Sequence, residues 1–518
     1  MKTVMNKHRL LVCLLIVAGV FAHSEGGHAG GIEVPDLGTV ALGRGTAFVA
    51  RADNLSAFYY NPAGLTKSKG PNLLLGSNLV NPRISYLRKG NDTLIWSDEN
   101  GIDYGKACDP AMGDICVDDP SQNYLDVSFG EGVFDPVDYE SASLQRRIGP
   151  APMLVFNWGD VFNVEGLALT AGLITPSGFG MPKYPENGPQ RYVMREANQL
   201  IVYPGAGVAY AFNRYIQVGG VFLSGISSIE MSRAVRLLSP LGHSGHNENL
   251  GGDVGFQIKV MDLFMPTGII GVLSNPLDWL EIGASVRLPV VVDAEGKITE
   301  FIAPPVEAPD AHLPAGRDNV SLKLNLPLVL RVGARYIHRY FDIEADFVWE
   351  RWSSLQETEI TTNAKVLATN PDLDSEFPKV NKVPMHFRDT YSVRLGGDVE
   401  VWPEHIAVRA GGYYQSSAYP ENNETFSLFA PFGEQIGVGG GLTWHACDFL
   451  DVNAAYLHVF QFDVTVDEGI VQQMALPYRE MNPETGETAA EIETGNIVNN
   501  GTYEVSMNIF GVSLEGHF

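Results

Sequence analysis

Side chains that could act as nucleophiles or bind metal ions are scattered along this chain of 518 residues. Gly242-His243-Ser244-Gly245 places a serine beside a histidine, but a nucleophile elbow needs one residue between the serine and the second glycine. His243 and His246 have no third ligand nearby, and the chain contains no His-Glu-x-x-His zinc helix. The acidic run Asp372-Leu373-Asp374 lacks the glycine and the spacing of a calcium loop. We therefore expect no enzyme activity, no catalytic residue, no metal site and no cofactor.

The first residues have the layout of a secretory signal. Three basic residues precede an apolar run from Leu10 to Phe21, as in a charged region followed by a short hydrophobic region. We expect residues 1–22 to be a signal peptide, with cleavage after Ala22 or as late as Ala29. Its removal takes away three basic and no acidic residues, so the formal net charge changes from −26 to −29. Because nucleic-acid binding depends on basic residues that neutralise phosphates, a nucleic-acid partner is not expected.

Three cysteines remain beyond the expected signal. Cys108 and Cys116 bracket a short polar segment, and a disulfide is the default state for such a pair in an oxidising compartment. A metal site built from these two cysteines is the alternative. Cys447 would then remain single.

From about residue 150 onward the chain repeats one unit, which consists of an alternating strand, a short polar turn and a second alternating strand. A period of two in hydrophobicity indicates β structure. Long polar stretches lie between these units, and a compact soluble domain rarely keeps so many. We place the six turns at Gly159-Asp160, Phe212-Asn213-Arg214, Ser274-Asn275-Pro276, His338-Arg339, Trp402-Pro403-Glu404 and His445-Ala446-Cys447-Asp448. We place the long stretches at 175–200, 228–253, 293–319, 351–388, 415–434 and 463–501.

Short turns at one end and long loops at the other are typical of outer-membrane barrels, which have an even number of strands. One further strand near Asn72–Tyr86 and one from Tyr503 to Phe518 bring the expected number to 14. The sequence thus predicts an all-β fold, a 14-stranded antiparallel transmembrane β-barrel over residues 71–518. Both chain ends would face the periplasm, and seven long loops, the largest at about 87–149, would face outward.

The last strand ends on an aromatic residue, as barrels assembled into the outer membrane do. Counting back from Phe518, an apolar face ends at Phe510, and polar side chains lie opposite. Above Phe510 the pattern inverts, because Tyr503 to Ile509 places its apolar residues on the other face. Either a β-bulge shifts the phase, or the upper interior of the barrel is apolar.

Four short motifs follow the expected signal, and together they resemble the N-terminal hatch of the FadL family of outer-membrane transporters. They are Gly30-Gly31-Ile32-Glu33-Val34-Pro35, Leu42-Gly43-Arg44-Gly45-Thr46-Ala47, Ala52-Asp53-Asn54-Leu55-Ser56-Ala57 and Tyr60-Asn61-Pro62-Ala63-Gly64-Leu65. The Asn-Pro-Ala signature of the family stands at Asn61, Pro62 and Ala63. The resemblance continues at residues 174–180, 190–192, 204–210, 391–397 and 407–413, so it covers nearly the whole mature chain, although the long loops do not match.

The resemblance implies uptake of hydrophobic molecules, most of all long-chain fatty acids, by passive diffusion. It implies a plug at residues 23–70 that fills the lumen, a binding pocket in the upper barrel, and a lateral exit beside a kinked third strand. By motif, the kink falls at Pro176, Gly178, Phe179 and Gly180. The alternative is an ordinary strand end, since proline cannot donate to a β ladder and glycine weakens it.

A fatty acid requires an apolar groove and a cation or polar donors near its carboxylate. Arg233 and Arg236 lie among apolar residues where the fifth expected strand leaves the membrane, and Arg191 is a further candidate. For each of the three, an exposed arginine that faces solvent or lipopolysaccharide is the alternative. Phe179 and Phe222 are candidates for the pocket or, equally, for the lipid-facing aromatic girdle.

Other functions compete with fatty-acid uptake. The same fold would serve aromatic or alkane hydrocarbons, and a lipid hydrolase or an adhesin are the remaining classes. A hydrolase needs a serine and histidine on neighbouring strands, which we cannot place, and an adhesin needs no hatch. The expected partners are a hydrophobic small molecule, outer-membrane lipid and lipopolysaccharide, and we expect a monomer.

Overall fold

The structure is a computed structural model that describes most of the chain. The described residues are 37–89, 108–109, 115–116, 141–143, 149–176, 183–184, 188–237, 253–302, 318–366, 375–376, 379–473, 475–476, 479–481, 488–490 and 497–518. The expected signal peptide, Gly178, Phe179, Gly180 and the loop histidines 243 and 246 lie outside them. No helix in the described part of the chain combines the length and hydropathy needed to cross a bilayer.

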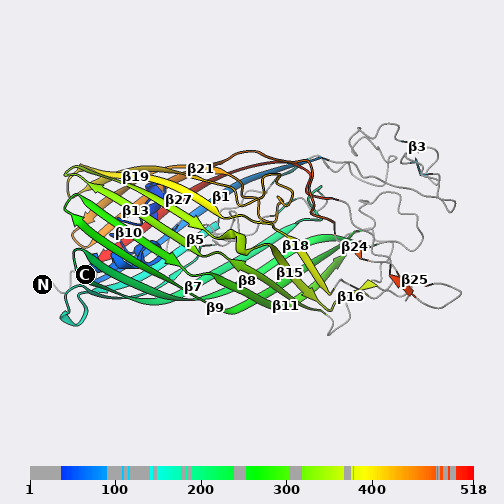
Figure 1. Cartoon of the computed structure of the whole chain (residues 1–518), viewed down its shortest axis with the longest axis horizontal. Helices are drawn as coiled ribbons and strands as arrows, with labels where there is room; N and C mark the ends of the chain where they lie inside the picture. Colours follow the sequence, from blue (N-terminus) through cyan, green and yellow to red (C-terminus); the bar gives the residue numbers. More distant parts are fainter. Residues whose placement is uncertain are drawn as a thin grey trace.

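The described strands form a closed antiparallel β-barrel, as the sequence predicts (Figure 1). The chain runs 14 times along the wall of this barrel, and we call each of these passages a crossing. Five of the crossings consist of two strands each, separated by a short break. In order around the barrel, the crossings are β1 (Gly70–Arg88), β5 (Gly149–Gly159), β6 (Leu167–Ile174), β7 (Glu196–Asn213), β8 (Ile216–Leu237), β9 (Asp253–Leu277), β10 (Leu280–Arg287) with β11 (Val290–Ile302), β12 (Asn319–Leu326) with β13 (Val329–Ile337), β14 (Phe341–Glu350) with β15 (Glu357–Thr362), β18 (Val380–Pro384) with β19 (Thr390–Trp402), β20 (Ile406–Gln415), β21 (Gln435–Cys447), β22 (Leu450–Gln461) with β23 (Val464–Val466), and β27 (Gly501–His517).

Short strands lie at the end of the barrel that carries the long loops. β4 (Ser141–Ser143) and β24 (Ala475–Leu476) extend the main sheet, and three small pairs stand apart from it: β2 (Cys108–Asp109) with β3 (Ile115–Cys116), β16 (Lys365–Val366) with β17 (Ser375–Glu376), and β25 (Arg479–Met481) with β26 (Thr488–Ala490). The last residue lies at the opposite end, beside the short turns (Figure 1).

The first and last strands close the barrel. β1 and β27 pair from Asn72 with His517 to Arg88 with Gly501, without any shift in register. Tyr503, Val505, Met507 and Ile509 all lie inside and are at most 7% exposed. The phase of the last strand is therefore continuous, and the apolar upper interior, one of the two alternatives left by the sequence, is the correct one.

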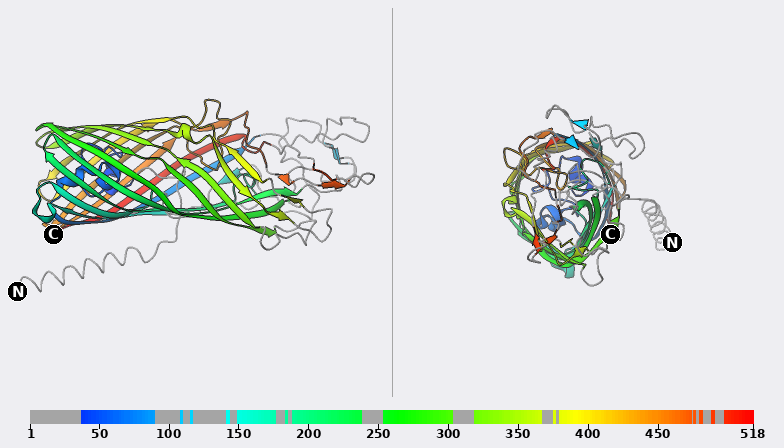
Figure 2. Two further views of the ribbon diagram at one scale, coloured as in Figure 1. Left: turned by 60° about the horizontal axis from the view of Figure 1, so that its bottom comes forward. Right: turned by 90° about the vertical axis from the view of Figure 1, so that its right-hand side faces the viewer.

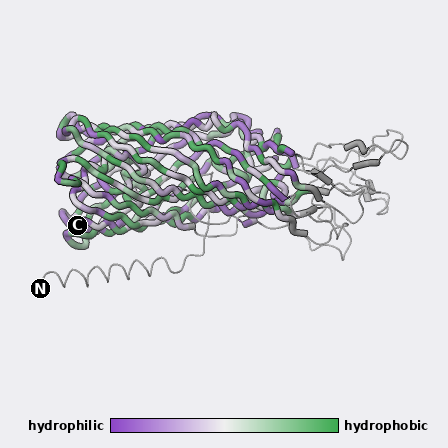
Figure 3. Tube along the Cα trace, turned by 90° about the horizontal axis from the view of Figure 1, so that it is seen from below, coloured by the Kyte–Doolittle hydropathy of each residue, from purple (hydrophilic) through white to green (hydrophobic). Residues whose placement is uncertain are grey.

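The outer face of the wall changes character along the barrel. Alternate strand residues in the part near the short turns expose large apolar side chains such as Phe222, Phe347 and Val512. Farther from the turns, outward positions carry charges, for example Lys323 and Asp293, which lie 3.3 Å apart and are both about half exposed. Hydrophobic and hydrophilic residues alternate along the strands (Figure 3). An apolar belt below a charged collar is the pattern of a barrel held in a membrane.

Two of the five breaks contain prolines. Pro289 separates β10 from β11, and Pro327 separates β12 from β13, while the register is unchanged across the break, from the pair Arg287–Val329 to the pair Val290–Leu326. Proline has no N–H for the ladder, so it interrupts pairing here. By contrast, Ser274-Asn275-Pro276 is not a turn as predicted, because β9 continues to Leu277 and the chain turns only before Leu280.

Residues 37–68 lie inside the barrel rather than in its wall (Figures 1 and 2). This segment contains three short helices: α2 (Thr39–Gly43), α3 (Ala57–Tyr60) and η1 (Pro62–Lys67). Nearly all of its apolar side chains are at most 5% exposed. We call residues 37–68 the hatch segment.

Candidate functional site

The Asn-Pro-Ala turn of the hatch segment packs directly against backbone atoms of the wall. Asn61 is fully buried, and its Nδ2 donates to the carbonyl oxygens of Val49 at 2.8 Å and of Val272 on β9 at 3.0 Å. A Cβ atom at Gly271 would lie 2.0 Å from Asn61 Oδ1, and one at Gly219 on β8 would lie 2.4 Å from the carbonyl carbon of Pro62. Glycine at these two positions therefore lets the turn approach the wall.

Ion pairs attach the first half of the hatch segment to β14 and β19 of the wall. The Arg44 side chain is fully buried, and it pairs with Asp342 at 2.8 Å, with Glu344 at 3.1 Å and with Asp398. The backbone N–H groups of Phe48 and Ala50 donate to Asp346 at 2.8 Å and to Glu344 at 2.6 Å. Buried carboxylates are stable only with such partners, so the network specifies where the hatch segment sits.

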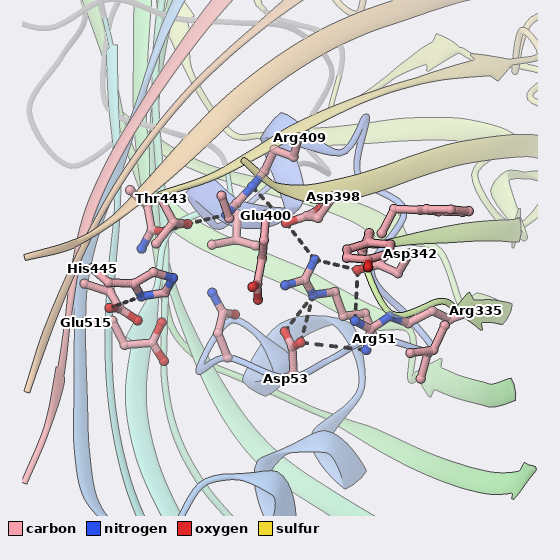
Figure 4. Close-up of a pocket in the computed structure, with 18 of the residues that line it drawn as sticks. Arg51, Asp53, Arg335, Asp342, Asp398, Glu400, Arg409, Thr443, His445 and Glu515 are labelled. Atoms are coloured by element: carbon pink, nitrogen blue, oxygen red, sulfur yellow. Dashed lines mark hydrogen bonds and ion pairs between the residues drawn. The ribbon is translucent and has the colours of Figure 1, made fainter. Parts of the chain in front are cut away.

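Arg51 and Asp53 continue this network (Figure 4), in a pocket whose lining also includes the short turn at His338 and Arg339. Arg51 Nε lies 2.8 Å from Asp53, and Arg51 also pairs with Asp398 at 2.8 Å. Burial by itself would raise the pKa of Asp53, but the nearby cations, Arg51 first, outweigh burial and hold that pKa well below its usual range. Asp53 is therefore a carboxylate throughout the ordinary pH range.

A polar cavity of about 420 Å³ lies beside this network. Its lining includes Arg51, Asp53, Arg335, His445 and His517. Side chains of both charges surround the cavity (Figure 4), which is unlike the apolar pockets that hold hydrocarbon ligands. Among the described residues, no group of His, Cys, Asp and Glu could hold a metal ion.

Above the hatch segment the interior is apolar. Side chains from many crossings of the wall point inward there and form one continuous buried cluster with residues of the hatch segment. This cluster has the chemistry of a hydrocarbon path. The cluster includes Ile84, Tyr86, Met153, Ile174, Ile201, Val260, Val290, Val292, Leu322, Leu324 and Val505.

The third crossing, β6, is shorter than its neighbours. Its ladder with β7 ends at the pair Ile174–Tyr203, whereas β7 continues beside β8 to Glu196. Pro176 follows directly and is buried. The ladder thus ends at the position for which the sequence predicts a kink, although Gly178, Phe179 and Gly180 lie outside the described residues.

Two of the predicted ligand-binding residues lie close together, because the carbonyl oxygen of Arg191 accepts from the N–H of Ala234, next to Arg233, at 2.8 Å. Arg191 is fully buried, with its guanidinium 2.9 Å from the Tyr192 hydroxyl, and Arg233 is partly buried on β8. Arg236 pairs through its backbone with Asp253, and its side chain lies outside the description. Phe222 is 57% exposed on the outer face, between the buried Val221 and Leu223, so its assignment to an interior pocket is wrong.

The backbone brings the two cysteines of the predicted disulfide together. Cys108 and Cys116 are direct partners in the β2–β3 pair, and directly opposed residues have Cα atoms within the range of a disulfide. Their side chains are not described. Cys447 is a free cysteine near a short turn.

The charged residues that hold the hatch segment were not predicted from the sequence. Arg44 belongs to a quoted motif, but no role was assigned to it, and its partners lie about 300 residues away. One signal was available on β14, where Asp342, Glu344 and Asp346 alternate with Ile343, Ala345 and Phe347. Three acidic residues on the inner face of one strand require cations from elsewhere in the fold.

Comparison with known proteins agrees with this architecture. The family described as outer membrane protein transport protein (OMPP1/FadL/TodX) matches residues 20–493. No curated protein matches the chain. Three solved structures are similar at low identity. A FadL homologue from Pseudomonas aeruginosa is 15% identical with a TM-score of 0.64, over 95% of this chain and 100% of that one.

The other two are toluene transporters. TbuX from Ralstonia pickettii is 14% identical, and TodX from P. putida is 13% identical. Each has a TM-score of 0.57 and aligns over 94% of this chain and 99% of its own. At such identities the likeness concerns the fold.

Proposed function

Because the chain belongs to the family of outer-membrane transport proteins that includes OMPP1, FadL and TodX, we propose that it takes up long-chain fatty acids by passive diffusion, with lateral release into the membrane. Its place in the outer membrane and its transport of hydrophobic compounds follow from the family and the barrel. The choice of fatty acids and the lateral route are the proposal.

The observation that carries the lateral route is the end of the β6–β7 ladder beside the apolar interior. Ile174 and Tyr203 form the last pair, and both are 1% exposed. An alkyl chain gains about 0.8 kcal/mol for each buried CH₂ group, so release into water would forfeit most of the binding energy. Exit through the wall into the bilayer avoids this loss.

Aromatic hydrocarbons are the second candidate ligand. Toluene appears in the names of two similar structures, and the upper interior of this barrel contains aromatic side chains such as Tyr86 and Tyr503. Uptake of labelled oleate and labelled toluene, compared in cells that lack other such transporters, separates the two ligands. We expect oleate uptake to exceed toluene uptake, and the reverse order would refute the fatty-acid assignment.

Closing the third strand tests the lateral route. In the variant Pro176→Val with Gly178→Val and Gly180→Val, we expect oleate uptake to be lost while surface binding persists, because the strand can then continue its ladder. Pro289→Val is the matched control, since it fills another proline break in the wall. A correctly folded triple variant that takes up oleate at the wild-type rate would rule out the lateral route.

A further inference from the structure

The segment between β20 and β21, residues 416–434, turns into the barrel. It contains turns but no helix or strand. Phe426 is fully buried, and Tyr419 and Leu428 are at most 2% exposed. All three belong to the same buried cluster as the inward side chains of the wall.

Aromatic rings join this segment to the parts of the barrel that lie on either side of it. Phe426 contacts Tyr503 of β27 with ring centroids 4.9 Å apart, and Tyr503 stacks on Tyr86 of β1 at 4.5 Å. On the other side, Tyr419 contacts Phe426 at 4.6 Å and Phe387 at 4.9 Å. These five rings form a continuous row through the apolar interior.

The row lies above the hatch segment along the barrel. Below it, a second buried cluster joins Leu42 of the hatch segment to Met507 and Tyr413 of the wall, with Phe432 packed against the cluster. Met507 is four pairs closer to the short turns on β27 than Tyr503. The row therefore lies between the loop end of the barrel and the interior next to the hatch segment.

We propose that residues 416–434 are an inner gate, distinct from the hatch segment, which an apolar ligand displaces on its way inward, and that Asn499 is the positioning residue that holds the gate closed. This inference rests on the proposed function, since it assigns a step to the same transport path. The gate ends where β20 and β21 end, so it can swing without breaking a strand ladder.

Asn499 connects the gate with two other segments. It is fully buried, and its Nδ2 donates to the carbonyl oxygens of Glu424 at 2.8 Å and Phe426 at 2.9 Å. Its Oδ1 accepts from the N–H of Val471 at 3.1 Å, and its carbonyl accepts from the Tyr503 hydroxyl at 2.8 Å. One side chain thus fixes the gate to the rim.

Further contacts hold the gate from the opposite side. Thr425 Oγ1 donates to the carbonyl of Met385 at 2.6 Å, and His386 Nδ1 lies 2.9 Å from Glu424 Oε1. Arg388 donates its backbone N–H to the carbonyl of Ala418 at 2.6 Å and its Nε to that of Tyr419 at 3.0 Å, and it forms an exposed ion pair with Glu421 at 3.1 Å. Hydrogen bonds, ring contacts and exposed ion pairs each have modest net strength. An apolar ligand that replaces the ring contacts can therefore open the gate.

Thiol labelling tests the role of Asn499. A Met507→Cys reporter in a chain without Cys108, Cys116 and Cys447 should be protected from a membrane-impermeant maleimide added to whole cells. Asn499→Ala should raise the labelling rate roughly tenfold or more, because two buried hydrogen bonds to the gate are lost. Asn500→Ala is the matched control, since its side chain accepts from Gly469 and not from the gate. Equal labelling in the parent and Asn499→Ala would overturn the assignment of Asn499.

Cross-linking tests the gate itself. In the same cysteine-free background, His386→Cys with Glu424→Cys is joined by a short cleavable bis-thiosulfonate reagent. We expect oleate uptake to stop on cross-linking and to return after reduction, with heat-modifiability on gels unchanged throughout. Normal uptake by the cross-linked protein would refute the gate and leave the proposed function intact, whereas absent uptake before cross-linking would refute the proposed function.

Discussion

Arg44 is the residue on which the position of the hatch segment depends most. Its fully buried guanidinium faces three carboxylates of the wall, Asp342, Glu344 and Asp398. Removing one partner from a buried ion pair costs about 3–5 kcal/mol, because the remaining charges lose their compensation. The barrel itself does not require Arg44, since its ladders are complete without the hatch segment.

We therefore predict that Arg44→Leu releases the hatch segment from a folded barrel. Limited proteolysis should then cut residues 37–68 much faster than in the wild type, while heat-modifiability on gels persists. Lys67→Ala serves as the control, because Lys67 is partly exposed and makes one ion pair, with Glu281 at 2.8 Å. If the Arg44→Leu hatch segment is as resistant as that of the wild type, the ion pairs do not anchor it.

The contribution of Asp53 to the attachment is insensitive to mild acid. Its pKa lies below the usual value of about 3.9, since the surrounding cations, Arg51 first, overcome the effect of burial. A carboxyl group with a lowered pKa contributes stability above its unfolded pKa and loses it only as pH falls through the folded pKa. We predict that the part of the hatch segment's protection from pepsin-type cleavage that depends on Asp53 is nearly as large at pH 4 as at pH 7.

Asp53→Asn provides the comparison for this pH dependence. The amide cannot pair with Arg51 as a charge, so protection should be lower than in the wild type at pH 7 and at pH 4, and the difference should disappear only in strong acid. A difference between the two proteins that disappears between pH 6 and pH 4 would contradict the assignment.

At the scale of the element, the Asn-Pro-Ala turn fits β8 and β9 because two glycines leave space for it. A Cβ atom at Gly219 would lie 2.4 Å from Pro62, whereas one at the adjacent Gly220 would meet nothing closer than 3.8 Å. We predict that Gly219→Ala displaces the turn and exposes the hatch segment to protease, while Gly220→Ala does not. Both variants carry a glycine-to-alanine substitution in β8. Equal protease resistance of the two variants would show that the close approach of Pro62 to Gly219 is not needed.

At the scale of the whole molecule, the barrel has a charged lower interior filled by the hatch segment and an apolar upper interior. Deletion of residues 30–65 would leave Glu344, Asp346 and Arg409 facing an empty, polar lumen. We predict a folded barrel whose ion conductance in planar bilayers is well above that of the intact protein. A deletion variant that folds and conducts no more than the intact chain would show that the hatch segment is not the plug.

The sequence alone was sufficient for the barrel. Alternation of apolar and polar residues predicts each half-buried strand from its local sequence. The pattern of short turns and long loops predicts which strand ends lie at the same end of the barrel. Strand lengths were underestimated because the outward positions above the apolar belt are charged. Lys297 on β11 and Glu359 on β15 were thus placed in long loops, although both belong to paired strands.

The interior could not be predicted in the same way. Arg44 finds its carboxylates about 300 residues along the chain, and Asn499 reaches Phe426 across the lumen. The outward position of Phe222 depends on the phase of β8 relative to the whole closed wall. Strand patterns are local and follow from a period of two, whereas the contacts inside the barrel exist only after all 14 crossings have closed, so only the tertiary structure decides them.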